Sequence, residues 1–285
     1  MLNNKKDVFM ACESAYEEAR IVMFGADFDG TVSFRPGTRF GPAEIRKASY
    51  GIETWSMKIE KDLEQIKVFD LADIECPLGD VKAAHQKIFE TTQAIVHDGK
   101  IPMMLGGEHS CTYPAFKAIA QNYPTLVVIQ LDAHADLRDQ YMGLRESHAS
   151  VMKRIVDDIS WENIHQIGIR SATQDEHVLM KQNKTLRTFE DVDTMIKIIA
   201  NRPVYLTVDL DVLDPSIFPG TGTPEPGGIS FDDLIEVIKK ISTCQIVGMD
   251  VMELSPPCDV SGVSNVVAAK VVREMLLLIG GKYEE

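Results

Sequence analysis

The segment LVVIQLDAHADLRD, residues 126–139, combines an apolar strand with a cluster of ionisable side chains. Its first six residues are mostly apolar, as in a strand buried on both faces of a sheet. Asp132, His134 and Asp136 then follow at alternate positions. Burying two carboxylates and an imidazole is costly unless they are paired or bind a cation. The segment therefore predicts a core strand that ends at a polar site, with a metal ion as the favoured occupant.

Other apolar segments have the same strand character and are separated by longer segments with helical periodicity. The expected strands cover residues 21–27, 66–72, 101–107, 125–132, 164–170, 203–211 and 245–251. The clearest expected helices cover residues 81–99, 113–123, 148–158, 231–243 and 263–280. Apolar strands that alternate with helices indicate a parallel sheet covered on both faces. We therefore expect an α/β protein with one three-layer α/β/α domain over residues 1–285.

The composition is that of a globular protein with 45% apolar and 25% charged residues. A net charge of −14 disfavours nucleic acid as a partner, because duplex binding depends on Lys and Arg contacts to phosphate. It is compatible with a cationic substrate, although acidic charge can equally serve solubility alone.

Location is predicted from the N-terminal segment, the hydropathy and the cysteines. Residues 1–20 are too polar for a secretory signal, and no apolar run reaches the roughly 18 residues of a membrane span. The five cysteines are scattered without a CxxC pair, which favours reduced thiols. We expect a cytoplasmic protein with no membrane partner.

Polar residues follow three more of the expected strands. Glu108 and His109 follow residues 101–107, Asp209 and Asp211 end the strand at 203–211 with Asp214 just beyond, and Glu253 follows residues 245–251. The carboxyl ends of parallel strands meet at one edge of a sheet, where open α/β folds place their sites. All four groups are therefore expected to converge.

Each of these residues also has a purely structural interpretation. A single Asp at a strand end is often a helix N-cap or turn residue, His109 could be a hydrogen-bonded core histidine, and Glu108 could be an exposed acid in a first helical turn. The combined set is more informative than any member. It consists of His109, Asp132, His134, Asp136, Asp209 and Asp211. Four carboxylates in one pocket need about two divalent cations, and this oxygen-rich donor set suits Mn²⁺ better than structural Zn²⁺. Two metals that share carboxylates lower the pKa of a bridging water, so hydrolysis is the expected reaction class.

At this point the sequence resembles the ureohydrolase family, which contains arginases, agmatinases and related enzymes that hydrolyse guanidinium groups. The resemblance covers nearly the whole chain. Its motifs, in order, are SFRPGTRFGPAEIRKAS (33–49), GGEHS (106–110), DAHAD (132–136), SHAS (147–150), QIGIRS (166–171), VDLDVLDPSIFPGTGTPEPGG (208–228) and MDVMELSPP (249–257). It implies the arginase/deacetylase fold and a dinuclear Mn²⁺ centre. The residues implied to hold one Mn²⁺ are His109, Asp132, Asp136 and Asp209, and those for the other are Asp132, His134, Asp209 and Asp211.

The resemblance also implies catalytic roles. A metal-bridging hydroxide would attack the guanidinium carbon, with Asp136 accepting a hydrogen bond from it and passing its proton toward the leaving amine. Glu253 would bind the guanidinium group, and His148 would bind substrate and shuttle protons. His148 is followed here by Ala149, where agmatinases and arginases often have glycine. Residues 35–42 are expected at the rim of the site.

The motifs are most similar to those of bacterial agmatinases, which implies hydrolysis of agmatine to putrescine and urea, a step of polyamine biosynthesis. The alternatives are a guanidinobutyrase, a guanidinopropionase or an arginase. Arg138 and Arg145 raise the alternative of a carboxylate substrate such as 4-guanidinobutyrate, but both can equally be solvated. The family also suggests a homo-oligomer, a trimer or hexamer. A calcineurin-like phosphoesterase agrees less well because GD and GNH[DE] segments do not follow the DxH motif, and a single-zinc deacetylase because His109 and Asp136 indicate two metals. A non-catalytic guanidine-binding protein agrees less well because none of the metal ligands is lost, nor Glu253, nor His148.

Overall fold

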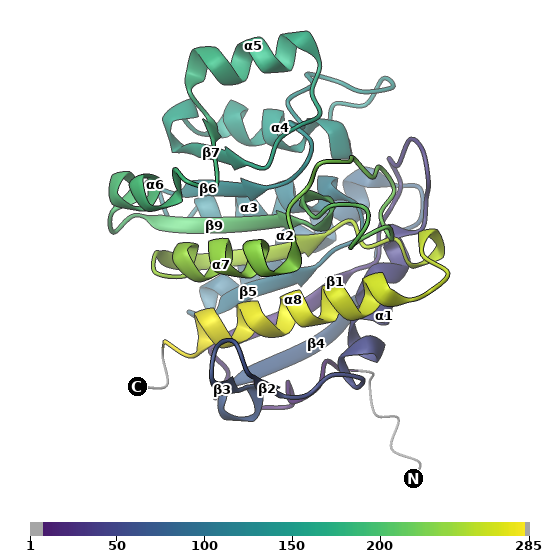
Figure 1. The fold of residues 1–285 in the computed structure, drawn as a ribbon, viewed down its shortest axis with the longest axis vertical. Coiled ribbons are helices and arrows are strands. Elements are labelled where there is room, and N and C mark those ends of the chain that lie inside the picture. The colour runs from purple at the N-terminus through teal and green to yellow at the C-terminus, as the bar shows by residue number, and fades with distance from the viewer. Residues whose placement is uncertain (1–7, 283–285) are drawn as a thin grey trace.

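The computed structural model describes residues 8–282, and its centre is a parallel sheet covered by helices on both faces (Figure 1). Within these residues the large sheet has eight strands in the order β4-β1-β5-β10-β9-β6-β7-β8, all paired in parallel. Its strands are β1 (Ile21–Ala26), β4 (Val68–Ile74), β5 (Ile101–Leu105), β6 (Val127–Leu131), β7 (Ile164–Ile167), β8 (Leu186–Arg187), β9 (Pro203–Asp209) and β10 (Gln245–Met252). A separate antiparallel hairpin is formed by β2 (Trp55–Ser56) and β3 (Lys61–Asp62).

The helices form two layers, one on each face of the sheet. They are α1 (Gly41–Ser49), α2 (Val81–His97), α3 (Thr112–Ala120), α4 (Val151–Asp158), α5 (Gln174–Asn183), α6 (Val192–Ile199), α7 (Phe231–Ile241) and α8 (Val263–Gly280). In Figure 1, α7 and α8 cross in front of the sheet, and α2 and α3 lie behind it. Alternate residues of one strand serve the two layers: Ile21 and Met23 of β1 pack with one apolar cluster, and Val22 and Phe24 with the other.

Local sequence signals start several of these helices. Asp80 caps α2 by accepting the backbone N–H of Ala83, and Ser230 and Asp233 form a reciprocal capping box at α7. Gly107 follows β5 because a Cβ there would lie 1.9 Å from the carbonyl oxygen of Phe28, so only glycine allows the close approach of these two backbones.

The expected three-layer fold with a parallel sheet is confirmed, and all seven expected strands are present with ends that differ by a few residues. The strands β2, β3 and β8 were not predicted, because two residues are too short to show a period. The ends of the expected single domain, residues 1–7 and 283–285, lie outside the described residues. Among the described helices, none combines the length and apolar character needed to cross a membrane.

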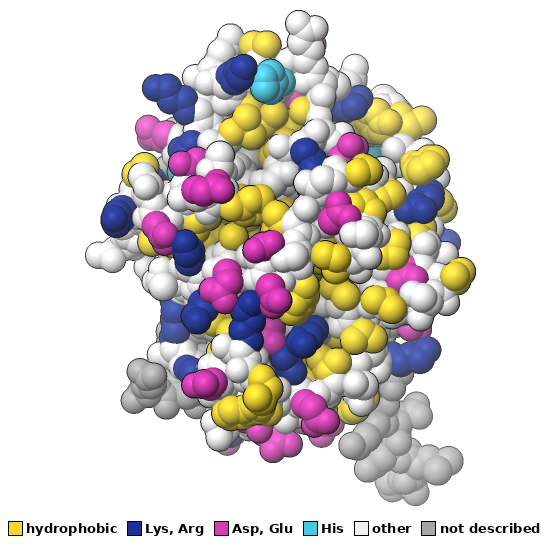
Figure 2. All heavy atoms as spheres, in the orientation of Figure 1, with side chains coloured by type: hydrophobic (Ala, Val, Ile, Leu, Met, Phe, Trp, Pro, Cys, Tyr) yellow, Lys and Arg dark blue, Asp and Glu magenta, His cyan; other side chains and the backbone are white. Residues whose placement is uncertain are grey.

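The surface shown in Figure 2 mixes acidic and basic side chains, with single apolar side chains between them. Oppositely charged surface neighbours include Lys58, which lies 3.0 Å from Asp232 and 3.3 Å from Glu236. Exposed pairs of this kind contribute little to stability. The distinctive polar chemistry of the molecule therefore lies inside the sheet edge.

Candidate metal centre

Four neighbouring strands at the middle of the sheet deliver the predicted polar residues to one place. The strands are β5, β10, β9 and β6, in that order across the sheet. Along the chain β6 is the strand that follows β5, but in the sheet these two strands are separated by β10 and β9, which come later in the sequence. This is the switch in strand order at which open α/β sheets form crevices.

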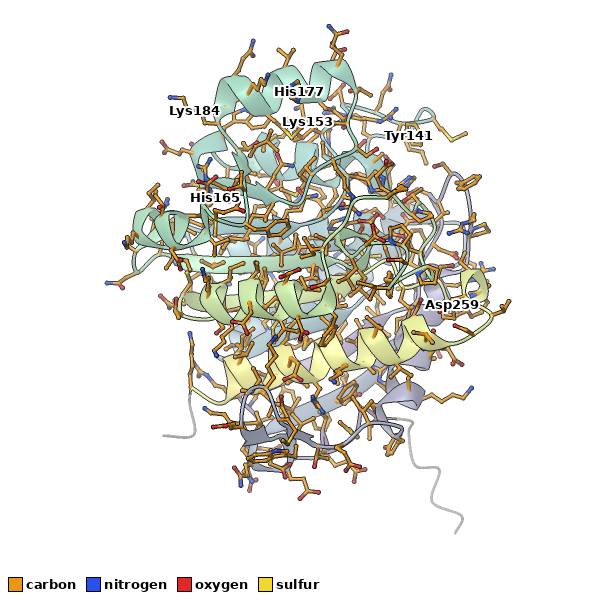
Figure 3. The ribbon with its side chains drawn as sticks, viewed as in Figure 1. Tyr141, Lys153, His165, His177, Lys184 and Asp259 are labelled. Carbon is orange, nitrogen blue, oxygen red and sulfur yellow. The ribbon has the colours of Figure 1, made fainter. Side chains whose placement is uncertain are left out.

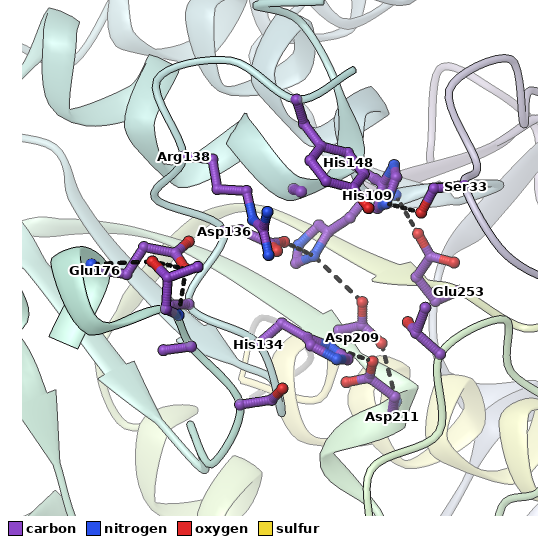
Figure 4. A pocket seen from close by; sticks show the side chains of 17 residues that line it. Ser33, His109, His134, Asp136, Arg138, His148, Glu176, Asp209, Asp211 and Glu253 are labelled. Carbon is purple, nitrogen blue, oxygen red and sulfur yellow. Dashed lines mark hydrogen bonds and ion pairs between the residues drawn. The ribbon is translucent and has the colours of Figure 1, made fainter.

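The six predicted metal-binding residues lie together at the carboxyl ends of β5, β6 and β9. We call them the Asp/His cluster: His109, Asp132, His134, Asp136, Asp209 and Asp211. Figure 4 labels all of them except Asp132. Five of them are buried, and the side chain of His134 is 26% exposed. Asp214, in contrast, serves a loop: its carboxylate accepts hydrogen bonds from Ser216 and from the backbone of Gly227.

The cluster has two centres. Around the first, Nδ1 of His109 lies 3.0 Å from Oδ2 of Asp132 and 3.2 Å from Oδ2 of both Asp136 and Asp209. Around the second, Nδ1 of His134 lies 2.8 Å from Oδ2 of Asp211 and 3.7 Å from Oδ1 of Asp132. Asp132 therefore has one oxygen toward each centre.

The two carboxylates expected to bridge differ in position. Asp132 takes part in both sets of ligand atoms that are close enough to hold one ion, His109–Asp132–Asp136 and Asp132–His134–Asp211. Asp209 has Oδ2 at the first centre, while its Oδ1 accepts the backbone N–H of Asp211 at 2.9 Å. The structure thus brings Asp209 into the cluster, and its bridging role stays a prediction.

The chemistry of the donor set fits a metal cation. Nε2 of His109 lies 2.9 Å from the hydroxyl of Thr207, an acceptor for a ring N–H, which leaves Nδ1 to face the three carboxylates. Both Nδ1 of His109 and Oδ2 of Asp211 are buried without a hydrogen-bond partner among the described residues. A buried nitrogen that faces carboxylate oxygens is stabilised by positive charge, which protonation of the ring or a bound cation can supply; despite its burial, the carboxylates accordingly raise the pKa of His109 well above its usual range.

The ionisation of the carboxylates also favours positive charge in the cluster. Burial, together with the negative charge of Asp132, raises the pKa of Asp136 to about 7. Burial and the charges of Asp211 and Asp132 raise the pKa of Asp209 well above its usual range. These acids resist ionising together in the protein alone, and a divalent cation would remove that penalty. The His/Asp cluster is therefore a metal-binding site in its chemistry.

Hydrogen bonds from the sheet hold the cluster in place. Gln130 of β6 donates from Nε2 to Oδ2 of Asp132 at 2.7 Å, and Gln166 of β7 donates to Oε1 of Gln130 at 2.8 Å. Thr185 then donates its hydroxyl to Oε1 of Gln166. This fully buried amide ladder orients Asp132 from below.

Two residues at the site have left-handed backbones, Asp136 with φ 53° and Glu253 with φ 68°. Such conformations cost a non-glycine residue about 1–2 kcal/mol and are frequent at functional sites. The backbone N–H of Glu253 donates to the carbonyl of Gly107 at 3.0 Å, and the carbonyl of Asp136 accepts from the N–H of Lys153 at 3.1 Å. These bonds to neighbouring segments stabilise both conformations.

A cavity of about 290 Å³ opens above the cluster, and the remaining predicted site residues line it. On one wall, Oε1 of Glu253 accepts the backbone N–H of His109 at 2.7 Å. Burial raises the pKa of this carboxyl to about 8. His148 also lines the cavity, near Ser33 and Tyr141, and burial lowers its pKa to about 4, so its imidazole is neutral at pH 7.

The residues considered for the rim of the site lie in different places. Residues 35–42 do not line the cavity; Arg35 instead donates to the carbonyls of Thr221 and Gly222, which anchors the loop that carries the lining residue Thr223. Arg138 lines the mouth with its guanidinium 4.6 Å from the Tyr141 ring centre. Arg145 is turned to Asp139 and Asp157, outside the cavity.

Sequence reasoning missed the hydroxyl and amide residues that support the site, among them Thr31, Ser33, Gln130 and Thr207. Their positions in the chain carry no metal-ligand spacing, and Thr31 meets His148 across 117 positions. Glu108 was considered as an exposed helix-start acid, yet its exposed fraction is 0%. Its carboxylate is instead enclosed by Thr31 and Ser110.

Comparison with known proteins identifies the family. A family model described as the arginase family matches residues 19–278. The chain belongs to the arginase family. Within this family it is similar to an agmatinase from Bacillus cereus, with 41% identity over 95% of both chains, and to an agmatinase from Halalkalibacterium halodurans, with 41% identity over 95% of this chain and 96% of the relative. The crystal structure of agmatine ureohydrolase from Thermoplasma volcanium superposes with a TM-score of 0.87 at 33% identity and covers 97% of this chain and 95% of its own.

Proposed function

We propose that this protein is an agmatinase, a hydrolase that converts agmatine to putrescine and urea with two bound Mn²⁺ ions. One observation carries the proposal: the buried Asp/His cluster forms the floor of a cavity in a chain that shares 41% identity, over 95% of its length, with an agmatinase. Two relatives described above are named agmatinase, and the protein of the superposed crystal structure is named agmatine ureohydrolase.

The cluster residues would hold the two ions. His109, Asp132, Asp136 and Asp209 are proposed for the first, and Asp132, His134, Asp209 and Asp211 for the second. Oxygen donors dominate this set and no thiolate takes part, which favours Mn²⁺ among the divalent metals. When bound, two such metal ions lower the pKa of a water molecule and so provide a nucleophile at neutral pH.

Glu253 is proposed to bind the guanidinium group. Its Oε1 is already fixed by the backbone N–H of His109 at 2.7 Å, which leaves the carboxylate oriented at the cavity wall. Guanidinium and carboxylate form charge-assisted, paired hydrogen bonds of defined geometry. Such a pair would hold the guanidinium carbon above the cluster in a reactive orientation.

Asp136 and His148 are proposed to handle protons. Oδ2 of Asp136 faces His109 at 3.2 Å, so Oδ1 is the atom that would accept a proton from the attacking water. His148 lines the same cavity and could pass a proton between the departing amine and solvent. Ala149, the residue after His148, also lines the cavity.

The test is urea release by the Mn²⁺-loaded enzyme with agmatine, arginine, 4-guanidinobutyrate and 3-guanidinopropionate compared side by side. We expect the highest kcat/KM for agmatine. If arginine or a guanidino acid is the better substrate, the agmatinase assignment is wrong while the family remains. Metal content by plasma emission, before and after chelation, decides whether Mn²⁺ is retained at two ions per chain.

Three further properties belong to the same proposal. A single ureohydrolase domain over residues 1–285 and a trimer or hexamer are proposed, and light scattering of the purified protein tests the assembly. A cytoplasmic location is proposed from the cysteines, all five of which are free thiols.

A further inference from the structure

The hydroxyl of Thr31 lies between two groups that the proposed mechanism leaves unconnected, the carboxylate of Glu108 and the imidazole of His148. Thr31 donates both its backbone N–H, at 2.6 Å, and its hydroxyl to the two oxygens of Glu108. On the other side, Oγ1 of Thr31 accepts the backbone N–H of His148 at 3.0 Å and lies 3.3 Å from its Nδ1. Thr31 is 8% exposed and Glu108 is 0% exposed.

A hydroxyl has one proton, so its two neighbours cannot both receive it. Glu108 is a strong acceptor that also receives the hydroxyl proton of Ser110. With its own proton committed to Glu108, Oγ1 of Thr31 can act toward the imidazole only as an acceptor. The ring atom that faces it, Nδ1 of His148, must then carry the proton of the neutral imidazole.

We infer that Thr31, held by Glu108, sets the tautomer of His148, with the proton on Nδ1 and Nε2 left as a hydrogen-bond acceptor at the cavity. Nε2 lies 3.3 Å from the hydroxyl of Ser33, and both residues line the cavity (Figure 4). The ring is also restrained by Tyr141, whose ring meets it edge-on at 90° with the centres 5.6 Å apart. Thr31 and Glu108 are thus positioning residues that act on the active site through His148.

The direction of this tautomer matters for the substrate, and that step rests on the proposed function. Guanidinium, ammonium and amine groups approach the cavity with N–H donors. An imidazole with an unprotonated Nε2 can accept a hydrogen bond from these groups. In the opposite tautomer Nε2 carries the proton, so an N–H donor of the ring would face the N–H donors of the substrate. The Thr31–Glu108 pair therefore makes His148 an acceptor for a cationic substrate before that substrate binds.

The inference is tested by solid-state NMR on protein labelled with ¹³C and ¹⁵N in histidine and loaded with diamagnetic Zn²⁺, at about pH 7.5 where His148 is neutral. Only Nε2 is bonded to Cδ2, so a ¹³C–¹⁵N correlation identifies which nitrogen is protonated. The His148→Asn variant assigns the signal among the seven histidines. We expect Nδ1–H in the native protein and in Thr31→Ser, which keeps the hydroxyl.

Two variants should reverse the tautomer for different reasons. Thr31→Val removes the acceptor for Nδ1–H. Glu108→Gln places an amide donor against Thr31, so the threonine proton turns toward Nδ1 of His148. In both we expect protonated Nε2 and a kcat at least about tenfold lower with a smaller change in KM, the size expected for impaired proton transfer.

Thr38→Val is the matched control, because Thr38 is a fully buried threonine of the same region whose hydroxyl has no partner among the described residues. It should keep Nδ1–H. The inference is overturned if Thr31→Val keeps Nδ1–H, or if Thr31→Ser loses it. The NMR result requires no substrate, so failure of every guanidino compound to release urea would refute the proposed function without changing the tautomer.

Discussion

At the scale of single residues, Glu253 shows how the backbone prepares a side chain for binding. Glu253 directly follows β10 and has a φ of 68°. Its backbone N–H donates to the carbonyl of Gly107, and its Oε1 accepts the backbone N–H of His109, both in the segment that follows β5. The carboxylate is therefore fixed at two points relative to the cluster. A substrate cation would meet an oriented partner that loses little freedom on binding.

Glu253→Gln should reduce kcat/KM for agmatine by about 10²-fold or more, because the amide keeps the shape but loses the charge that pairs with guanidinium. Bound metal, measured by plasma emission, should be unchanged since Glu253 is not a proposed ligand. Near-normal kinetics in a fully metal-loaded variant would contradict the guanidinium contact.

Thr207→Val should weaken metal binding by about 10–100-fold, the range typical for loss of a hydrogen bond to a metal-ligating histidine. The hydroxyl at 2.9 Å from Nε2 of His109 would be replaced by a methyl group of similar size. Competition with a chelator measures the change. The control is Thr221→Val, since Thr221 is also buried but its hydroxyl has no partner in residues 8–282. Equal metal affinity in the two variants would remove Thr207 from the site.

Sequence alone predicted the charged residues of the cluster better than their supports. Asp132, His134 and Asp136 announce themselves by alternate spacing after an apolar strand. Thr31 and Thr207 have ordinary side chains, and their importance arises only from contacts made by the folded chain. Glu108 was open to a surface interpretation because its neighbours in sequence do not reveal that Thr31 and Ser110 enclose it.

At the scale of elements, strand prediction succeeded where the apolar run was long. β9 and β10 have seven and eight residues and were anticipated with small errors at their ends. The helices α1, α5 and α6 lay outside the main expected ranges. In α1 and α5 few apolar residues mark a helical period, because GPAEIRKAS begins with Gly-Pro and QDEHVLMKQN is mostly polar. Of the three, α1 packs mainly on α8 and α6 on α7, whereas α5 begins with a capping box formed by Thr173 and Glu176.

The start of α8 offers a pH-dependent prediction. Asp259, labelled in Figure 3 at the loop before this helix, accepts hydrogen bonds from the backbone and hydroxyl groups of Ser261 and Ser264 at 2.6–2.9 Å. Burial favours the neutral acid, but these bonds prevail and lower the pKa of Asp259 to about 2. A lowered pKa contributes stability above the unfolded value of 3.8, and this contribution is lost as pH falls through about 2.

Asp259→Asn should therefore destabilise the protein by about 1–2 kcal/mol at neutral pH, where the charge-assisted bonds are complete. The difference from the native protein should shrink as pH is lowered from about 4 toward 2. Urea unfolding at several pH values measures both effects. A difference that stays constant over this range would show that the carboxylate charge does not stabilise α8.

At the scale of the whole molecule, the fold concentrates negative charge at the point where the strand order of the sheet switches. The overall charge of −14 is spread over many surface acids, but the four aspartates of the cluster are nearly fully buried. Burying these like charges together destabilises the folded protein unless a cation is present. Family and fold were predictable because they are indicated by long continuous motifs in the sequence. Assembly depends on the surface of the folded chain and metal identity on binding affinities, and neither is indicated by a sequence motif.

Removal of metal should lower the melting temperature. Ligand that binds only the folded state stabilises it by about 2.7 kcal/mol at one hundred times its Kd, which corresponds to roughly 5–10 °C for a chain of this size. Differential scanning calorimetry with Mn²⁺ and with excess chelator measures the shift. Asp132→Asn is the control, because it should lose most of the metal-dependent stabilisation. Identical melting of the native protein under both conditions would contradict metal binding by the cluster.

The position of β10 has a consequence for biosynthesis. This strand joins β4-β1-β5 to β9-β6-β7-β8, and it is the last strand of the sheet to be synthesised. Until it leaves the ribosome, His109 stands on one half of the sheet and the other five cluster residues on the other. A nascent chain therefore cannot assemble the complete cluster, and premature capture of metal would involve five residues without His109. Insertion of one strand late in translation thus couples completion of the sheet to completion of the site.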